Sequence, residues 1–139
     1  MPIEVPTEEQ IIRLNSGFVE RSGERYSLMN RAGLLSALAR PLHGADGCYF
    51  YRSIHEMAAA LLESLATNHP FTAGNKRTAI MATEIFLHRH GHVLIASDDE
   101  KYNFVVDVVT HKLEFPEIVQ WLQFHCHCIE PELVEELIR

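Results

Sequence analysis

The fold is decided by residues 53–91, which read SIHEMAAALLESLATNHPFTAGNKRTAIMATEIFLHRHG. The first part predicts a buried helix, because apolar residues recur every three or four positions after a possible N-cap residue, Ser53. A polar break over residues 68–74 follows, and a second helix is predicted from about Asn75 to His90, where Gly91 ends it. The sequence therefore predicts two central helices joined by one turn. The apolar residues of the first helix are Ile54, Met57, Ala58, Leu61, Leu62, Leu65 and Ala66.

Helical patterns also lie on both sides of this pair. Capping-box patterns begin predicted helices at Thr7 and Ser97, and shorter helices are predicted for residues 30–40, from Pro116 and from Pro131. Seven helical segments without an alternating strand pattern predict an all-α domain.

One segment before the first central helix differs from its surroundings. Residues 43–47 are typical of a turn, and the aromatic, β-favouring run from Cys48 to Tyr51 follows them. We therefore expect an exposed loop or a small hairpin over residues 44–50.

Length and composition limit the possible classes of protein. A chain of 139 residues with 47% hydrophobic and 22% charged residues fits one globular domain spanning residues 1–139. The formal net charge of −7 argues against nucleic acid as a direct partner. The longest apolar stretch, residues 57–62, is too short to cross a membrane, and the N-terminus does not resemble a secretion signal. We therefore expect neither a membrane-bound nor a secreted protein.

The cysteines indicate a reducing compartment. Cys48, Cys126 and Cys128 are an odd set, and two of them are too close in sequence for an ordinary disulfide framework. The run from His125 to Cys128 alternates two residue types that bind zinc, so a metal site is one reading of it. The run lacks the two-residue spacers of ordinary zinc sites, which favours the other reading, a helix end with incidental thiols.

The break between the central helices carries the residues suited to chemistry. A helix that starts after Gly74 offers free N–H groups and the positive end of its dipole to an anion. Lys76 and Arg77 oppose that dipole, which indicates a bound anion such as phosphate, with Arg77 as a bidentate donor and Lys76 as a point charge. Histidine titrates near neutral pH, so His69 is either a general base or one of several surface histidines.

The segment His69-Pro70-Phe71, followed by Gly74-Asn75-Lys76-Arg77, resembles the signature of the Fic/Doc family. That signature reads His, any residue, Phe, any residue, an acidic residue, Ala or Gly, Asn, Gly or Lys, and Arg. Residues 34–41, 58–66 and 96–100 are also similar to death-on-curing (Doc-like) toxins, so the resemblance covers essentially the whole chain.

The resemblance implies a compact helical bundle with a small β-hairpin flap. The motif loop, residues 69–77, would lie beside this flap, which holds the target protein. Residues 44–50 would form the flap, and Cys48, Tyr49 and Phe50 would dock a target segment by strand-like pairing.

The resemblance also implies an activity and partners. Family members transfer part of a nucleoside triphosphate such as ATP to a protein hydroxyl, and Doc-like members with lysine at the position of Lys76 act as kinases. His69 would deprotonate the target hydroxyl, Phe71 would anchor the loop and Asn75 would orient it. The target class would be a translation elongation factor. The protein would be a cytoplasmic, bacterial or phage-encoded toxin of a type II toxin–antitoxin system, inhibited by a separate antitoxin. The residues that would hold the phosphates are Gly74, Asn75, Lys76 and Arg77.

One position departs from the family pattern. Ala73 stands where the family has the acidic residue that holds Mg²⁺, and alanine has no ligand atom for this metal. Asp46 or Asp98 would then replace that residue, or the nucleotide alone would hold the metal. Two other functions stay open: transfer of AMP or UMP to a protein hydroxyl, and a degenerate module that binds partners without catalysis.

Overall fold

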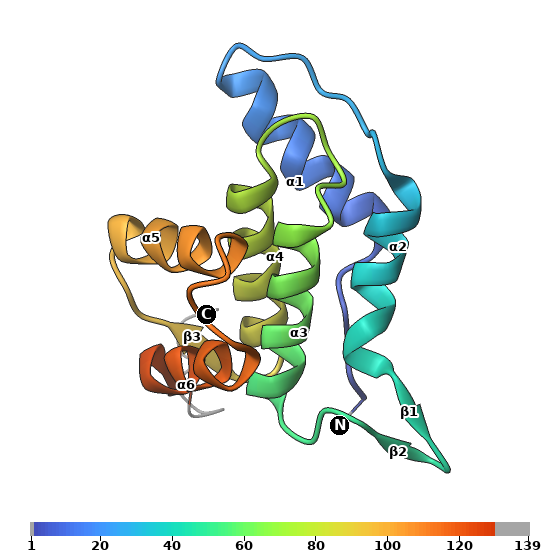
Figure 1. Ribbon diagram of the computed structural model, residues 1–139, viewed down its shortest axis with the longest axis vertical. Helices are drawn as coiled ribbons and strands as arrows, with labels where there is room; N and C mark the ends of the chain where they lie inside the picture. The colour runs from blue at the N-terminus through green and yellow to red at the C-terminus, as the bar shows by residue number, and fades with distance from the viewer. Residues whose placement is uncertain (1, 130–139) are drawn as a thin grey trace, which may run out of the picture.

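A computed structural model describes residues 2–129, which form six α-helices and four short strands. Figure 1 shows how the helices are arranged. The expected all-α bundle is confirmed, with strands confined to two small antiparallel pairs. The helix expected from Pro131 lies outside the described residues. None of the described helices is both long enough and apolar enough to cross a bilayer. In chain order the elements are α1 (Glu8–Arg21), α2 (Arg31–Ala39), a single 3-10 turn η1 (Arg40–Leu42), β1 (Gly44–Ala45), β2 (Cys48–Tyr49), α3 (Ile54–Thr67), α4 (Asn75–Arg89), β3 (His92–Leu94), α5 (Asp98–Val109), α6 (Phe115–His125) and β4 (Cys126–Cys128).

Helix α3 is the centre of the bundle, with α2, α4, α5 and α6 packed around it (Figure 1). Nine of its 14 residues are buried, because its sequence is apolar on nearly every side. Leu61, Leu62 and Leu65 are at most 1% exposed, and each contributes about 1.5–3 kcal/mol of burial free energy. This packing fixes the C-terminal end of α3, from which the motif loop leads into α4.

Side-chain caps fix where several helices begin. Thr7 and Ser97 each form the complete capping box that the sequence predicts for α1 and α5. Ser53 accepts a hydrogen bond from a backbone N–H in the first turn of α3, and Asn30 does the same for α2. Local sequence signals therefore set these four helix starts.

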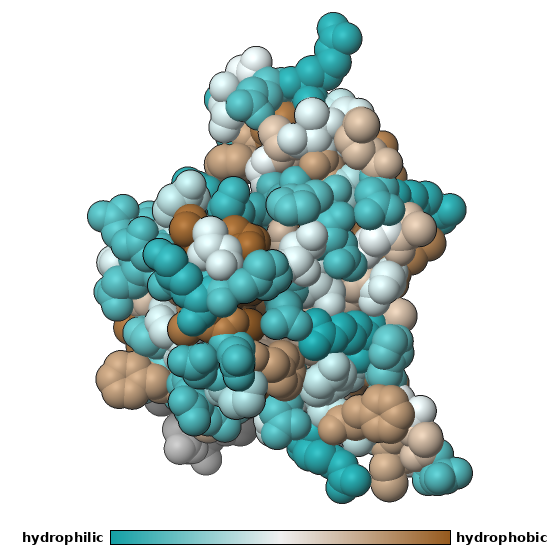
Figure 2. Space-filling view, in the orientation of Figure 1, coloured by the Kyte–Doolittle hydropathy of each residue, from teal (hydrophilic) through white to brown (hydrophobic). Residues whose placement is uncertain are grey.

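Residues 44–50 form the expected hairpin, but not beside the motif loop. Gly44 pairs with Tyr49, and Ala45 pairs with Cys48. The hairpin comes before α3 and the motif loop comes after it, so they lie at opposite ends of a 14-residue helix, about 20 Å apart (Figure 1). The expectation that this hairpin borders the motif loop is therefore wrong. The apolar patch at the hairpin end in Figure 2 agrees with the exposure of Leu42, Tyr49 and Phe50.

A second strand pair was not expected from the sequence. Helix α6 ends at His125 and the chain continues as β4, which pairs with β3 between Leu94 and Cys126 at one end and between His92 and Cys128 at the other. Burial raises the pKa of the Cys126 thiol to about 11, and the nearby Cys128 thiol adds to the effect. Within residues 2–129, no group of three or more His, Cys, Asp or Glu side chains is arranged to hold a metal ion.

Candidate active site

Backbone hydrogen bonds tie the motif loop to the segment between α1 and α2. The carbonyl oxygen of Pro70 accepts from the N–H of Met29 at 2.8 Å and from the N–H of Asn30 at 2.9 Å. The N–H of Thr72 donates to the carbonyl oxygen of Ser27 at 3.0 Å. The loop is thus held along one side by residues 27–30, which the sequence analysis did not single out.

Asn75 fixes the conformation of the loop from the start of α4. Its Nδ2 donates to the carbonyl oxygen of Phe71 at 2.8 Å, and its Oδ1 accepts from the N–H of Phe71 at 3.0 Å. Phe71 is 3% exposed and packs in the core. The Asn75 side chain therefore orients the loop, and the Phe71 ring anchors it.

His69 is exposed and has a backbone φ of 47°. This left-handed conformation costs a residue with a side chain about 1–2 kcal/mol. None of the hydrogen bonds within residues 2–129 uses its imidazole ring. The ring is therefore open to solvent and to a large partner.

The start of α4 is an uncapped, cationic helix tip. Its N-cap residue is Gly74, which supplies no side-chain hydrogen bond, and the first turn contains no acidic residue. The first N–H groups of a helix have no partner within it, and the dipole there disfavours the positive charges of Lys76 and Arg77. An anion bound at this tip would accept hydrogen bonds from these N–H groups and would offset the positive charges of Lys76 and Arg77.

Helix α1 packs against this tip. Gly74 has a φ of 77°, and a Cβ atom on it would lie 3.1 Å from side-chain atoms of Asn15, Phe18 and Val19. The guanidinium of Arg77 lies 4.8 Å from the centre of the Phe18 ring, a cation–π contact. The close approach of α1, together with the positive φ, therefore favours glycine at position 74.

Asn15 is a site residue that the sequence analysis missed. It is fully buried, and its Nδ2 donates to the carbonyl oxygen of Ala73 at 2.8 Å and to Oγ1 of Thr78 at 3.1 Å. A signal existed in the sequence, because Asn15 lies midway between the apolar Ile11 and Val19 at intervals of four residues. All three are buried on one face of α1. A polar residue at such a position needs a partner.

A cleft between α4 and α5 brings several predicted site residues together. Its volume is about 130 Å³, and Lys76, Arg77 and Asp98 line it. An ion pair between Lys101 and Glu84, with 2.6 Å between Nζ and Oε1, joins the two helices there. The size and the cationic groups of the cleft suit a phosphate group.

Other predicted residues lie away from this cleft. His69 does not line it, and lies at the other end of the motif loop. Asp46 lies in the hairpin turn at the far end of α3, so the alternative in which it replaces the missing acidic residue of the motif is wrong. Cys48, Tyr49 and Phe50 lie at that same far end, so their position does not support target docking beside His69.

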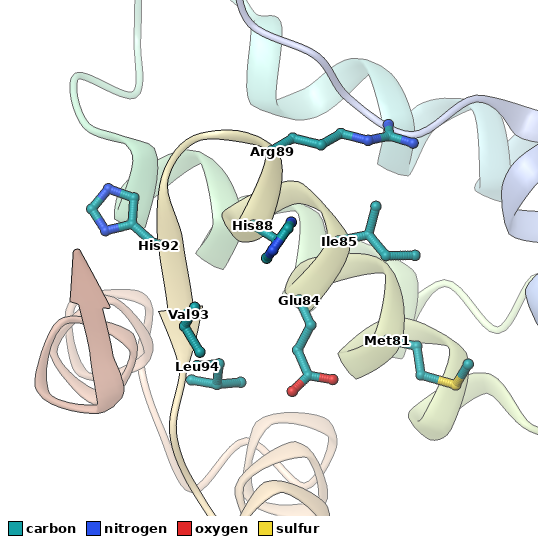
Figure 3. A pocket seen from close by; sticks show the side chains of 8 residues that line it. All are labelled: Met81, Glu84, Ile85, His88, Arg89, His92, Val93 and Leu94. Carbon is teal, nitrogen blue, oxygen red and sulfur yellow. The ribbon is translucent and has the colours of Figure 1, made fainter. Parts of the chain in front are cut away.

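A larger hollow continues along α4 toward β3 (Figure 3). Its volume is about 490 Å³, and it shares Met81 and Glu84 with the cleft. Four of the eight side chains that line it are apolar, namely Met81, Ile85, Val93 and Leu94, and the other four are polar or charged. The cleft and the hollow are therefore neighbours along α4, with Met81 and Glu84 lining both.

Comparisons with known proteins agree with this site. The sequence model of the Fic/DOC family matches residues 5–87, which include α1, the motif loop and the tip of α4. Toxin Doc of Mycolicibacterium smegmatis is 48% identical over 68 residues, which make up 48% of this chain and 52% of that protein. The chain therefore spans about half the length of this curated relative. The family match covers more than half of the chain and contains the complete motif loop, and so the chain belongs to the Fic/DOC family.

Proposed function

We propose that this protein is a Doc-like toxin that transfers the γ-phosphoryl group of a nucleoside triphosphate to a hydroxyl group of a protein. The proposal rests on the uncapped tip of α4, where Lys76 and Arg77 line one cleft. Lysine at this motif position supports phosphoryl transfer over nucleotidyl transfer. Its side chain would fill the space for the innermost phosphate, so the nucleotide would bind reversed and present its γ-phosphoryl group.

In the proposed reaction, His69 accepts the proton of the target hydroxyl while the hydroxyl oxygen bonds to the γ-phosphorus. The bond from that phosphorus to the β–γ bridging oxygen breaks, and the nucleoside diphosphate leaves with the electron pair. Lys76 and Arg77 neutralise charge on the phosphates, with Arg77 able to donate two hydrogen bonds. Catalysis of this kind depends on positioning and charge neutralisation.

We propose that Asp98 would hold magnesium, because Glu84, the other carboxylate that lines the cleft, is paired with Lys101. Asp98 lines the cleft with the two cationic residues of the motif, whereas Ala73 has no ligand atom. One carboxylate suffices when phosphates and waters supply the other ligands of Mg²⁺. Bound there, the ion would neutralise part of the phosphate charge.

The wider biological role is inferred from the name of the relative and from the family resemblance. The name Toxin Doc supports a toxin, and we propose that a separate antitoxin holds it inactive. We propose a translation elongation factor as the target class, so that its modification halts growth. An exposed His69 suits a substrate as large as a folded protein.

A second candidate is a degenerate module that binds a partner without catalysis. Two observations favour it: Ala73 replaces the acidic motif residue, and His69 does not line the cleft that contains Lys76 and Arg77. This module would keep the fold and the cleft between α4 and α5 but would modify no protein.

Label transfer separates these functions. Purified protein is incubated with Mg²⁺, a bacterial lysate and ATP labelled at either the α- or the γ-phosphate. The proposed kinase puts only the γ-label on a lysate protein, and His69→Ala slows that transfer by about 100-fold or more. Transfer of the α-label would show nucleotidyl transfer. Transfer of neither label, together with growth inhibition that survives His69→Ala, would show the degenerate module.

A further inference from the structure

We propose that Asn30 is a positioning residue for His69, because it holds the carbonyl groups on both sides of the histidine. Its Nδ2 donates to the carbonyl oxygen of Asn68 at 3.1 Å, and its backbone N–H donates to the carbonyl oxygen of Pro70 at 2.9 Å. Asn68 precedes His69 and Pro70 follows it. One residue outside the motif therefore holds the peptide group before His69 and the peptide group after Pro70, on either side of the His69-Pro70 dipeptide.

Asn30 is itself held in place by the start of α2. Its Oδ1 accepts from the N–H of Gly33 at 2.9 Å as the N-cap of this helix. A Cβ atom on Gly33 would lie 2.4 Å from Asn30 Nδ2, so glycine leaves the space that the amide occupies. Asn68 Nδ2 donates in return to the carbonyl oxygen of Gly33 at 3.0 Å. Asn30 and Asn68 thus join the start of α2 to the end of α3.

The backbone of His69 explains why such a hold is needed. With φ at 47°, this residue stays in the left-handed region only if its surroundings prevent relaxation to a more stable conformation. Loss of the bond from Asn30 to Asn68 frees the peptide group before His69. The imidazole then leaves the position from which it reaches the target hydroxyl.

The effect falls on the chemical step and not on nucleotide binding. Asn30 does not line the cleft between α4 and α5, which contains Lys76 and Arg77. A displaced general base lowers kcat, whereas an intact phosphate cleft keeps the KM for ATP. The inference rests on the proposed function, since it gives Asn30 a role relative to the proposed base.

Asn30→Asp tests the inference with a single lost donor. Aspartate is as good an N-cap as asparagine and keeps the backbone N–H to Pro70, but it cannot donate to Asn68. We expect γ-label transfer into the lysate protein to slow by about tenfold or more at saturating ATP, with the KM for ATP within about twofold. The matched control is Ser53→Ala. It also removes an N-cap, but at the start of α3, the end of that helix far from Asn68 and His69. Its transfer rate should stay at the parent value.

A double variant separates positioning from general damage. In a His69→Ala background, Asn30→Asp should cause no further loss, because the group that it positions is gone. An equal loss in both backgrounds, or a KM for ATP that rises as kcat falls, would overturn the inference.

A structural readout keeps this test independent of the activity. If the parent protein transfers no label, the proposed function fails, and NMR scalar couplings that report the φ of His69 then decide the inference. Movement of φ away from the left-handed region in Asn30→Asp, but not in Ser53→Ala, supports the positioning role. An unchanged φ in Asn30→Asp overturns it.

Discussion

The side-chain amide of Asn15 in α1 donates a hydrogen bond to the carbonyl oxygen of Ala73 in the motif loop, 58 residues further along the chain, at 2.8 Å. The same Nδ2 donates to Oγ1 of Thr78 in α4. Its Oδ1 is buried and has no hydrogen-bond partner within the described part of the chain. One buried amide therefore joins α1, the loop and α4, although its own oxygen, Oδ1, accepts no hydrogen bond within the described residues.

Asn15→Ala should lower both stability and ATP affinity. The carbonyl of Ala73 and the hydroxyl of Thr78 lose a buried donor, so we expect the free energy of unfolding to fall by about 1–3 kcal/mol in urea denaturation. Thr78→Val is the control, because it removes one bond of Asn15 but not the bond to the loop. It should cost about 1 kcal/mol and leave ATP affinity unchanged. Equal weakening of ATP binding by both variants would contradict a loop-specific role.

Gly74→Ala should destabilise the protein more than the same change at Gly23. Both glycines have a positive φ, 77° and 80°, so both variants carry the backbone strain of about 1–2 kcal/mol. Only at Gly74 would the new Cβ also meet neighbours, at 3.1 Å from Asn15, Phe18 and Val19, whereas nothing lies within 4 Å at Gly23. Urea denaturation of the two variants measures the difference. Equal losses would mean that α1 does not pack tightly against the tip of α4.

The stability of the protein should fall as the pH falls below neutral. Burial lowers the pKa of His55 and of His92, and each is further lowered by a neighbouring histidine, His92 and His90 respectively. The unfolded chain takes up protons near pH 6.5, before the folded protein does, so the free energy of unfolding decreases from about pH 7.5 to 5.5.

His55→Gln should make this pH dependence shallower, because one of the two partly buried rings is gone. Its ring centre lies 4.7 Å from that of His92, so the change also removes their repulsion. The exposed His43 provides the control, and His43→Gln should keep the slope of the parent. Urea midpoints across the pH range measure the slopes. Equal slopes in all three proteins would show that His55 does not cause the pH dependence of stability.

Asp98→Asn should weaken the binding of the Mg²⁺ that supports label transfer, because it removes a carboxylate that lines the cleft. We expect the Mg²⁺ concentration for half-maximal transfer to rise by about tenfold. Asp99→Asn is the matched control, since both residues lie in the first turn of α5 and interact alike with its dipole. A magnesium titration that shifts equally in both variants would exclude Asp98 as a specific ligand.

The sequence predicted the helices well because their signals are local. The caps at Thr7, Ser53 and Ser97 and the glycine before α4 set element boundaries through residues within one turn. The motif loop was placed correctly for the same reason, since it fills the break between two strongly apolar helices.

The missed features depend on contacts between distant residues. Strand β4 is three residues long and exists through pairing with β3, which is too short for a periodic signal. Residues 27–30 pair with the motif loop only once the helices have packed. The cleft that Lys76 and Asp98 share also forms only then. The hairpin at residues 44–50 was recognised from turn chemistry, but its distance from His69 follows from the length of α3.

The most direct test of the account is calorimetric titration of ATP with Mg²⁺ into the parent protein, Arg77→Ala and Arg89→Ala. The two arginines lie on α4, one at the uncapped tip and the other in the last turn. The account predicts that Arg77→Ala weakens ATP binding by about tenfold to a hundredfold, because a charge-assisted bidentate contact is lost, and that Arg89→Ala binds like the parent. Equal ATP affinity in all three proteins, or no ATP binding by the parent, would contradict a phosphate site at the tip of α4.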